Sequence, residues 1–198
     1  ATLSSRYYDV SYPSGFSSFN SSQRNAVREI LNLYSDVANI DFVETSSVGT
    51  ITFGNHAMSG GVGAYAYYPN LQRVFPADAA PLSGDVWVNT TNTGTAKGSW
   101  GYLTLIHEIG HAIGLKHPGN YNAGGGGTEG PYLPSSLDSH KYTVMSYSDH
   151  PNYPNTSPVS PMLFDITALQ FLYGKNMSTR TGNDTYSFST TTELRTIW

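Results

Sequence analysis

Apolar residues in the first quarter of the chain recur at three- and four-residue steps, which is the spacing of one face of an α-helix. The residues on this face are Val27, Ile30, Leu31, Tyr34 and Val37. Asn20 or Ser21 can cap the start, because both side chains accept hydrogen bonds from free backbone N–H groups. The pattern predicts a helix over Ser21–Val37.

Short runs of β-branched and aromatic residues, closed by turn-forming residues, come next and predict strands. They are Ile40–Thr45, Thr50–Gly54, Gly61–Tyr68 and Gly84–Asn89.

Helical spacing returns over Ser99–Leu115. Its apolar stripe is formed by Trp100, Leu103, Ile106, Ile109 and Ile113. Gly114 lies near the end of this helix, and Pro118 prevents the helix from continuing further. Residues 119–160 are rich in Gly, Pro, Ser, Asn and Tyr, so we expect them to be irregular.

A third helix is predicted over Pro161–Tyr173, with Ser160 as its cap, Pro161 in its first turn and Gly174 as its stop. The order of elements indicates a single α+β domain over residues 1–198, with the strands preceding a central helix.

Composition narrows the candidate functions. The net charge is −4, only 12% of residues are charged, and like charges do not form blocks. We therefore expect neither nucleic acid nor a membrane surface as a partner. No apolar run approaches the ~20 residues that span a bilayer. The chain has no cysteine, so any metal site must use other ligands.

The chemistry is carried by HEIGHAIGLKH at residues 107–117. On a helix, His107 and His111 point the same way, and two imidazoles so placed can reach one zinc ion. Glu108 borders the same face and is expected to act as the base that takes a proton from metal-bound water. His117 can join only if the chain reverses, which a left-handed Gly114 would allow.

These residues, followed by KYTVMSY at 141–147, resemble the metzincin zinc endopeptidases, in which HExxHxxGxxH precedes a Met-turn. HPGNYNAG at 117–124 and DITALQFLYGKN at 165–176 resemble the serralysins, which are secreted bacterial metzincins. The resemblance implies a metzincin-type zincin fold, with a twisted mixed sheet, an active-site helix and a C-terminal helix.

The resemblance also assigns roles. It implies that the three histidines bind Zn²⁺ and that Met145 forms an apolar floor beneath the metal. Tyr147 would coordinate the metal in the resting enzyme and bind the oxyanion during catalysis. Protein or peptide substrates would lie along an exposed strand, for which Gly63, Ala64, Tyr65 and Ala66 are the candidates. A proteinaceous inhibitor is a further expected partner, and we expect a monomer.

Serralysins continue into a calcium-binding β-roll of GGxGxD repeats, which the sequence up to Trp198 does not contain. We therefore expect a catalytic domain without the β-roll. Residues 175–198 would form a C-terminal extension, and Ca²⁺ would bind mainly in the roll.

Other assignments stay open. The fold could serve a zinc-binding or adhesive module of weak activity, or a metzincin of another subfamily such as the astacins or matrixins. His140 and His150 are interpreted as surface loop residues. Asp165 is expected to support its own helix, the alternative being an outer-shell hydrogen bond near the site.

Overall fold

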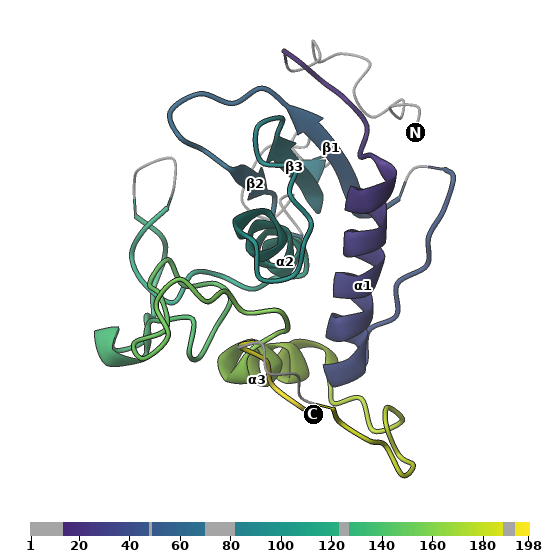
Figure 1. Ribbon diagram of the computed structural model, residues 1–198, viewed down its shortest axis with the longest axis vertical. Coiled ribbons are helices and arrows are strands. Elements are labelled where there is room, and N and C mark those ends of the chain that lie inside the picture. The colour runs from purple at the N-terminus through teal and green to yellow at the C-terminus, as the bar shows by residue number, and fades with distance from the viewer. Residues whose placement is uncertain (1–13, 48, 70–81, 123–126, 188–192) are drawn as a thin grey trace.

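The computed structural model describes residues 14–47, 49–69, 82–122, 127–187 and 193–198. Within these ranges, three α-helices and a small sheet make up the α+β arrangement that the sequence predicts (Figure 1). A short 3-10 helix, η4 (Ser135–Leu137), lies in the otherwise irregular region after the second helix.

Helix α1 (Ser21–Val37) has the bounds that its apolar spacing predicts. The Asn20 side chain accepts from the N–H of Gln23 at 2.9 Å, and the Gln23 side chain accepts from the N–H of Asn20 at 3.1 Å. This capping box satisfies two backbone donors that the helix leaves free. Tyr34 is fully buried, and its hydroxyl donates to the carbonyl of Ile106 at 2.7 Å, which ties α1 to the central helix.

The sheet holds β1 (Thr52–His56), β2 (Ala64–Ala66) and β3 (Asp85–Asn89) in the order β1-β3-β2. β1 runs parallel to β3, and β2 runs antiparallel to it, so the sheet is mixed as predicted. Every residue of the central strand β3 is buried. β2 therefore forms one edge of the described sheet.

The prediction of a strand over Ile40–Thr45 is wrong. This segment is extended but forms no ladder, because no described strand lies beside it to accept its backbone hydrogen bonds. The side chains of Ile40 and Phe42 pack against the core, while that of Val43, the residue after Phe42, is 88% exposed. The apolar residues of this segment therefore cover the surface of the core without forming a strand. β1 also begins two residues later than predicted.

The central helix α2 (Trp100–Ala112) is capped by Ser99, whose hydroxyl accepts from the N–H of Tyr102 at 3.2 Å. Helix α3 spans Leu163–Tyr173 and ends before Gly174. The predicted cap at Ser160 is wrong, because the Ser160 hydroxyl accepts instead from the N–H of Thr196 at 3.0 Å.

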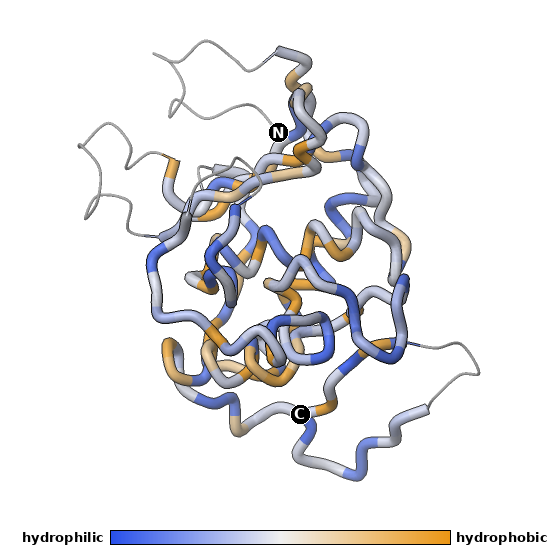
Figure 2. The backbone as a smooth tube through the Cα atoms, turned by 90° about the vertical axis from the view of Figure 1, so that its left-hand side faces the viewer, coloured by the Kyte–Doolittle hydropathy of each residue, from blue (hydrophilic) through white to orange (hydrophobic). Residues whose placement is uncertain are grey.

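The core lies where the sheet, α1 and α3 surround α2 (Figure 1). Figure 2 shows hydrophobic positions running through the interior between these elements. All twelve residues of α2 that follow Trp100, from Gly101 to Ala112, are buried. No helix in the described residues is both long enough and apolar enough to span a membrane.

Candidate metal centre

Helix α2 carries the first part of the site. His107 and His111 lie one turn apart in its C-terminal half and are 7% and 6% exposed. Glu108 lies between them in sequence and is buried to the same degree. The sequence predicts Trp100 in the apolar stripe of this helix, but its side chain is 66% exposed, because it stands at the N-terminal end of a helix whose remaining residues the core surrounds.

The chain reversal that His117 requires is present. Gly114 has a φ of 104°, which a residue with a side chain rarely adopts. The N–H of Gly114 donates to His111 and the N–H of Leu115 donates to Gly110, both at 2.9 Å, and this pair of bonds forms a Schellman motif. The predicted reversal is thus confirmed, and it returns His117 toward the helix.

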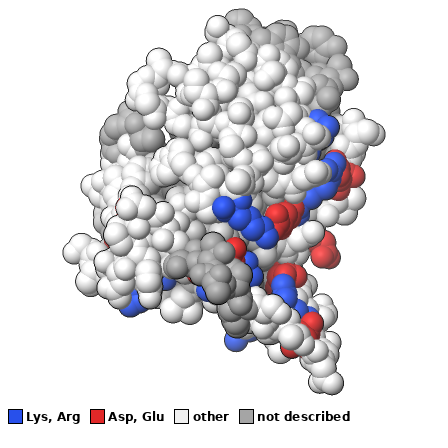
Figure 3. All heavy atoms as spheres, in the orientation of Figure 1, with Lys and Arg blue, Asp and Glu red and all other residues white. Residues whose placement is uncertain are grey.

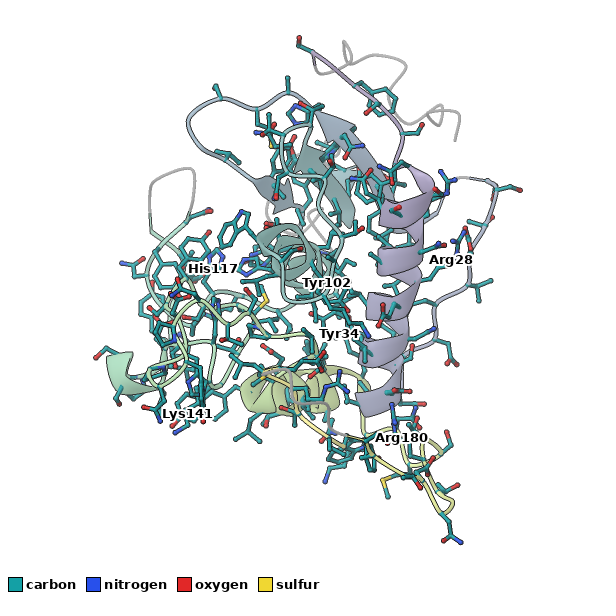
Figure 4. All side chains as sticks on the ribbon, viewed as in Figure 1. Arg28, Tyr34, Tyr102, His117, Lys141 and Arg180 are labelled. Atoms are coloured by element: carbon teal, nitrogen blue, oxygen red, sulfur yellow. The ribbon has the colours of Figure 1, made fainter. Side chains whose placement is uncertain are left out.

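The three imidazoles converge on one point. Nε2 of His117 lies 3.1 Å from Nε2 of His107 and 3.0 Å from Nε2 of His111. Three nitrogens on a tetrahedral zinc ion, each at about 2.0–2.1 Å, would be about 3.3 Å apart, close to these values. Figure 4 shows His117 beside α2, pointing toward the helix.

Hydrogen bonds on the opposite side of two rings fix their protonation. Nδ1 of His107 lies 2.8 Å from the carbonyl of Val144, and Nδ1 of His111 lies 2.7 Å from the carbonyl of Leu115. A carbonyl only accepts, so each Nδ1 carries the proton and each Nε2 keeps its lone pair. His117 could donate to only one of these lone pairs, so a cation at the centre satisfies the set better than a proton does.

Burial keeps the rings in the neutral form that metal ligands need. Burial, with repulsion from the neighbouring rings, lowers the pKa of His107 well below its usual range and lowers the pKa of His111 to about 3. This triad is also the one cluster of metal-binding side chains within the described residues. The residues present therefore fit a zinc ion.

The buried carboxyl group of Glu108 has one oxygen, Oε2, without a hydrogen-bond partner among the described residues. Burial raises the pKa of its carboxyl to about 8 in the metal-free protein. A buried acceptor left open beside a metal-binding cluster is suited to receive a proton.

The Met-turn passes directly beneath the helix. Met145 is 1% exposed, and its sulfur approaches Gly110 so closely that a Cβ at that position would lie 2.7 Å from it. Glycine at 110 therefore permits the contact between helix and turn. Met145 therefore packs against the helix turn between His107 and His111.

Tyr147 also reaches the triad, with its ring centroid 4.9 Å from that of His117 and 5.7 Å from that of His107. Sequence reasoning missed Tyr121, whose ring lies 4.7 Å from Tyr147 and 5.3 Å from His117. The Tyr121 hydroxyl donates to Asp138 at 2.8 Å. Its position four residues after His117, within the serralysin-like phrase, was the available signal.

The candidate substrate strand coincides with β2. Gly63 accepts a backbone bond from Asn89, and Tyr67 donates one to Asp85, so this side of the segment is used by β3. Since backbone groups alternate along a strand, those of Ala64 and Ala66 face the other edge, where no described strand pairs. The segment leads to the site, because the rings of Tyr68 and His111 lie 5.2 Å apart.

His140 and His150 were interpreted as surface residues, and this interpretation is wrong. They are 4% and 8% exposed. Nε2 of His140 lies 2.9 Å from the carbonyl of Ser146 in the Met-turn. Loop histidines become buried here because the irregular region folds back on itself, as the bond from the N–H of His140 to the carbonyl of Ser148 at 2.8 Å shows.

Charged side chains are unevenly distributed. Figure 3 shows them concentrated near α1 and the C-terminal segment, whereas the side formed by the loop region after α2 is almost uncharged.

Comparisons with known proteins agree with this geometry. A model of metallo-peptidase family M12 matches residues 2–157. Serralysin from Proteus mirabilis is 42% identical over 198 residues, covering 89% of this chain and 39% of the relative. Metallopeptidase AprA from Pseudomonas marginalis is 37% identical and Serralysin C from Dickeya chrysanthemi is 36% identical, each with 90% of this chain and 39% of the relative covered.

The chain thus spans about two fifths of the length of these curated relatives. Their names confirm the resemblance to serralysins that the sequence phrases indicate. Together with the family match over most of the chain, they establish that this protein belongs to metallopeptidase family M12.

Proposed function

We propose that this chain is the catalytic domain of a secreted zinc endopeptidase that hydrolyses peptide bonds in extended protein substrates. The observation that carries the proposal is the convergence of three buried Nε2 atoms within 3.0–3.1 Å, beside an unpaired buried carboxylate. When bound, zinc supplies a Lewis acid for the scissile carbonyl and lowers the pKa of a coordinated water to about 7.

In this proposal Glu108 accepts the proton of the attacking water and passes it to the leaving amine. Two features support this role. Its buried Oε2 atom has no described protein partner that would compete for the proton. Burial raises the pKa of this carboxyl to about 8 in the metal-free protein, and a cation bound at the triad would favour the ionised form that a base requires.

The Tyr147 hydroxyl is proposed to hydrogen-bond the oxyanion that develops on the substrate, and to lie on the metal in the resting state. The ring is half exposed and stands beside two of the three histidines, so it borders both the metal position and solvent. Met145 is proposed to support the triad through its contact with Gly110 and not to bind the metal.

Substrate is proposed to add to the open edge of β2 as an extended strand. Ala64 and Ala66 would supply the backbone donors and acceptors, and Gly63 and Tyr65 would hold the strand to β3. Recognition through backbone groups, on a face with few charges, favours broad cleavage of neutral sequences.

The alternative of an inactive zinc-binding or adhesive module keeps the same metal site. The intact pair of Glu108 and Tyr147 favours the enzyme, and the relatives named serralysins favour that subfamily over astacins or matrixins.

One experiment separates the enzyme from the module. The purified protein is expected to hold one zinc per chain and to digest casein, and a chelator should abolish both the zinc and the digestion. Zinc bound without any casein hydrolysis would indicate the module. Digestion that continues after complete removal of the metal would refute the proposed mechanism.

A further inference from the structure

The Met-turn supplies a hydrogen-bond partner to His107, one of the three histidines proposed to bind the metal. The carbonyl of Val144 accepts from Nδ1 of His107 at 2.8 Å. Val144 belongs to an irregular segment, so no regular backbone ladder fixes its carbonyl. Something else must hold this peptide in place if the ring of His107 is to keep its orientation.

That support comes from Asp165, in the first turn of α3 and 1% exposed. Its Oδ2 atom accepts from the N–H of Val144 at 2.8 Å, and its Oδ1 atom accepts from the hydroxyl of Thr143 at 2.5 Å. The Thr143 hydroxyl in turn accepts from the N–H of Met145 at 2.9 Å. One carboxylate thus organises three consecutive residues of the turn.

A role limited to capping α3 does not account for these contacts. The capping bond is the one from the N–H of Met162 to Oδ2 of Asp165, at 2.8 Å. The two remaining bonds leave the helix and go to the Met-turn. A buried carboxylate costs several kcal/mol in desolvation, and an exposed acceptor could cap the helix without this cost.

We propose that Asp165 is a positioning residue for the metal site: through the backbone of Val144 it fixes the ring and the tautomer of His107, so that Nε2 presents its lone pair to the metal. The inference rests on the proposed function only for the identity of the metal. Asp165 acts on His107 indirectly, because the backbone of Val144 lies between them: its N–H donates to Asp165 and its carbonyl accepts from His107.

The test measures metal binding in the absence of substrate. In Asp165→Ala, the zinc Kd determined by competition with a chelating dye is expected to rise 10- to 100-fold, as when other outer hydrogen-bond partners of zinc ligands are removed. The visible absorption bands of the Co²⁺-substituted protein should also change. Asp165→Asn keeps an oxygen for the N–H groups of Val144 and Met162, so it should recover most of the affinity.

Leu169→Ala is the matched control, because Leu169 is fully buried on the same helix and its side chain has no polar group that could hold the Met-turn. It should lower thermal stability and leave the zinc Kd and the Co²⁺ spectrum unchanged. A folded Asp165→Ala protein with wild-type Kd would overturn the proposal. So would a loss of affinity in Leu169→Ala equal to that in Asp165→Ala.

If Asp165→Ala does not fold, Thr143→Val provides the decisive comparison. It removes one donor to Asp165 and one acceptor for Met145 while conserving volume. The zinc Kd of Thr143→Val should rise measurably, although by less than the 10- to 100-fold expected for Asp165→Ala. An unchanged Kd would overturn the proposal. Absence of peptide hydrolysis by the wild-type protein would refute the proposed function alone, because these readouts do not depend on turnover.

Discussion

We propose different roles at the metal site for two side chains that are adjacent in sequence. Nδ1 of His107 bonds to the Val144 carbonyl, which leaves Nε2 available to a metal, whereas Glu108 has a buried oxygen with no partner among the described residues. Adjacent residues on a helix point about 100° apart, so one can bind the metal while the next borders it. This division lets the ligand and the proton acceptor be tested separately.

In Glu108→Gln, we expect unchanged zinc content and a fall in kcat of at least 10²- to 10⁴-fold on a fluorogenic peptide, because the amide cannot accept the proton of water. In His111→Ala, both the zinc and the activity should be lost. Zinc content by mass spectrometry and kcat from steady-state kinetics distinguish the two. Substantial turnover by the glutamine variant would remove Glu108 from its proposed role.

His140 makes stability depend on pH. Burial lowers its pKa below the usual histidine range, against weaker opposing effects of the Ser146 carbonyl and of nearby aspartates. A depressed folded-state pKa means that the neutral ring contributes stability above about pH 6.5, and that this contribution is lost as pH falls.

The free energy of unfolding of His140→Gln, measured by urea denaturation at saturating zinc, should therefore fall less steeply than that of the wild type between about pH 6.5 and 5. The difference in slope can reach about 1.4 kcal/mol per pH unit, the effect of one proton. Above pH 7 the two profiles should run parallel. Identical slopes at acid pH would show that His140 does not take up the proton on unfolding.

At the scale of elements, the helix and the strand that border the site are held in different ways. α2 ends in a Schellman motif that sets the path to His117, and both bonds of that motif are local. β2 has only three residues and is held on one side by β3. Its other edge has no partner strand among the described residues, and the proposed substrate would pair there.

Ala66→Pro tests this edge. Proline is tolerated on an edge strand where the missing N–H faces outward, so the fold should persist. The loss of one backbone bond to substrate is expected to lower kcat/KM about 3- to 10-fold on an extended peptide, since such a bond contributes about 0.5–1.5 kcal/mol. Ala66→Ser keeps the N–H and is the control. Unchanged kcat/KM in a folded proline variant would place substrate elsewhere.

For the whole molecule, the metal site joins segments that lie far apart in the sequence. The three histidines come from α2 and the loop after it, and His107 extends the connection to the Met-turn and α3 through Val144 and Asp165. A ligand that binds only the folded chain stabilises it in proportion to its free concentration over its Kd.

Removal of zinc should therefore lower the Tm. At a zinc concentration about 1,000-fold above the Kd, the bound ion contributes about 4 kcal/mol, which corresponds to a Tm difference on the order of 10 °C for a chain of this size. Calorimetry with and without chelator measures it, and added zinc should restore the original Tm. The metal-free His111→Ala protein should show no shift with chelator, and an equal shift there would mean that the chelator acts on something other than this site.

Local sequence signals were sufficient for much of this protein. The spacing of His107 and His111 follows from helix periodicity, and Gly114 signals the reversal because few other residues adopt its positive φ. The bounds of α1 follow from the capping residue Asn20 at its start and from an apolar stripe that runs to Val37 at its end. In each case the determining interactions lie within a few residues of one another.

Only the tertiary structure decided the rest. Whether Ile40–Thr45 became a strand depended on a partner, and no strand of the described residues lies beside it; the burial of His140 depended on how a long loop folds over itself. Asp165 lies 58 residues beyond His107 in sequence, and no periodicity relates them. Their connection arises because a desolvated carboxylate must find donors wherever the folded chain brings them, and here it finds them in the Met-turn.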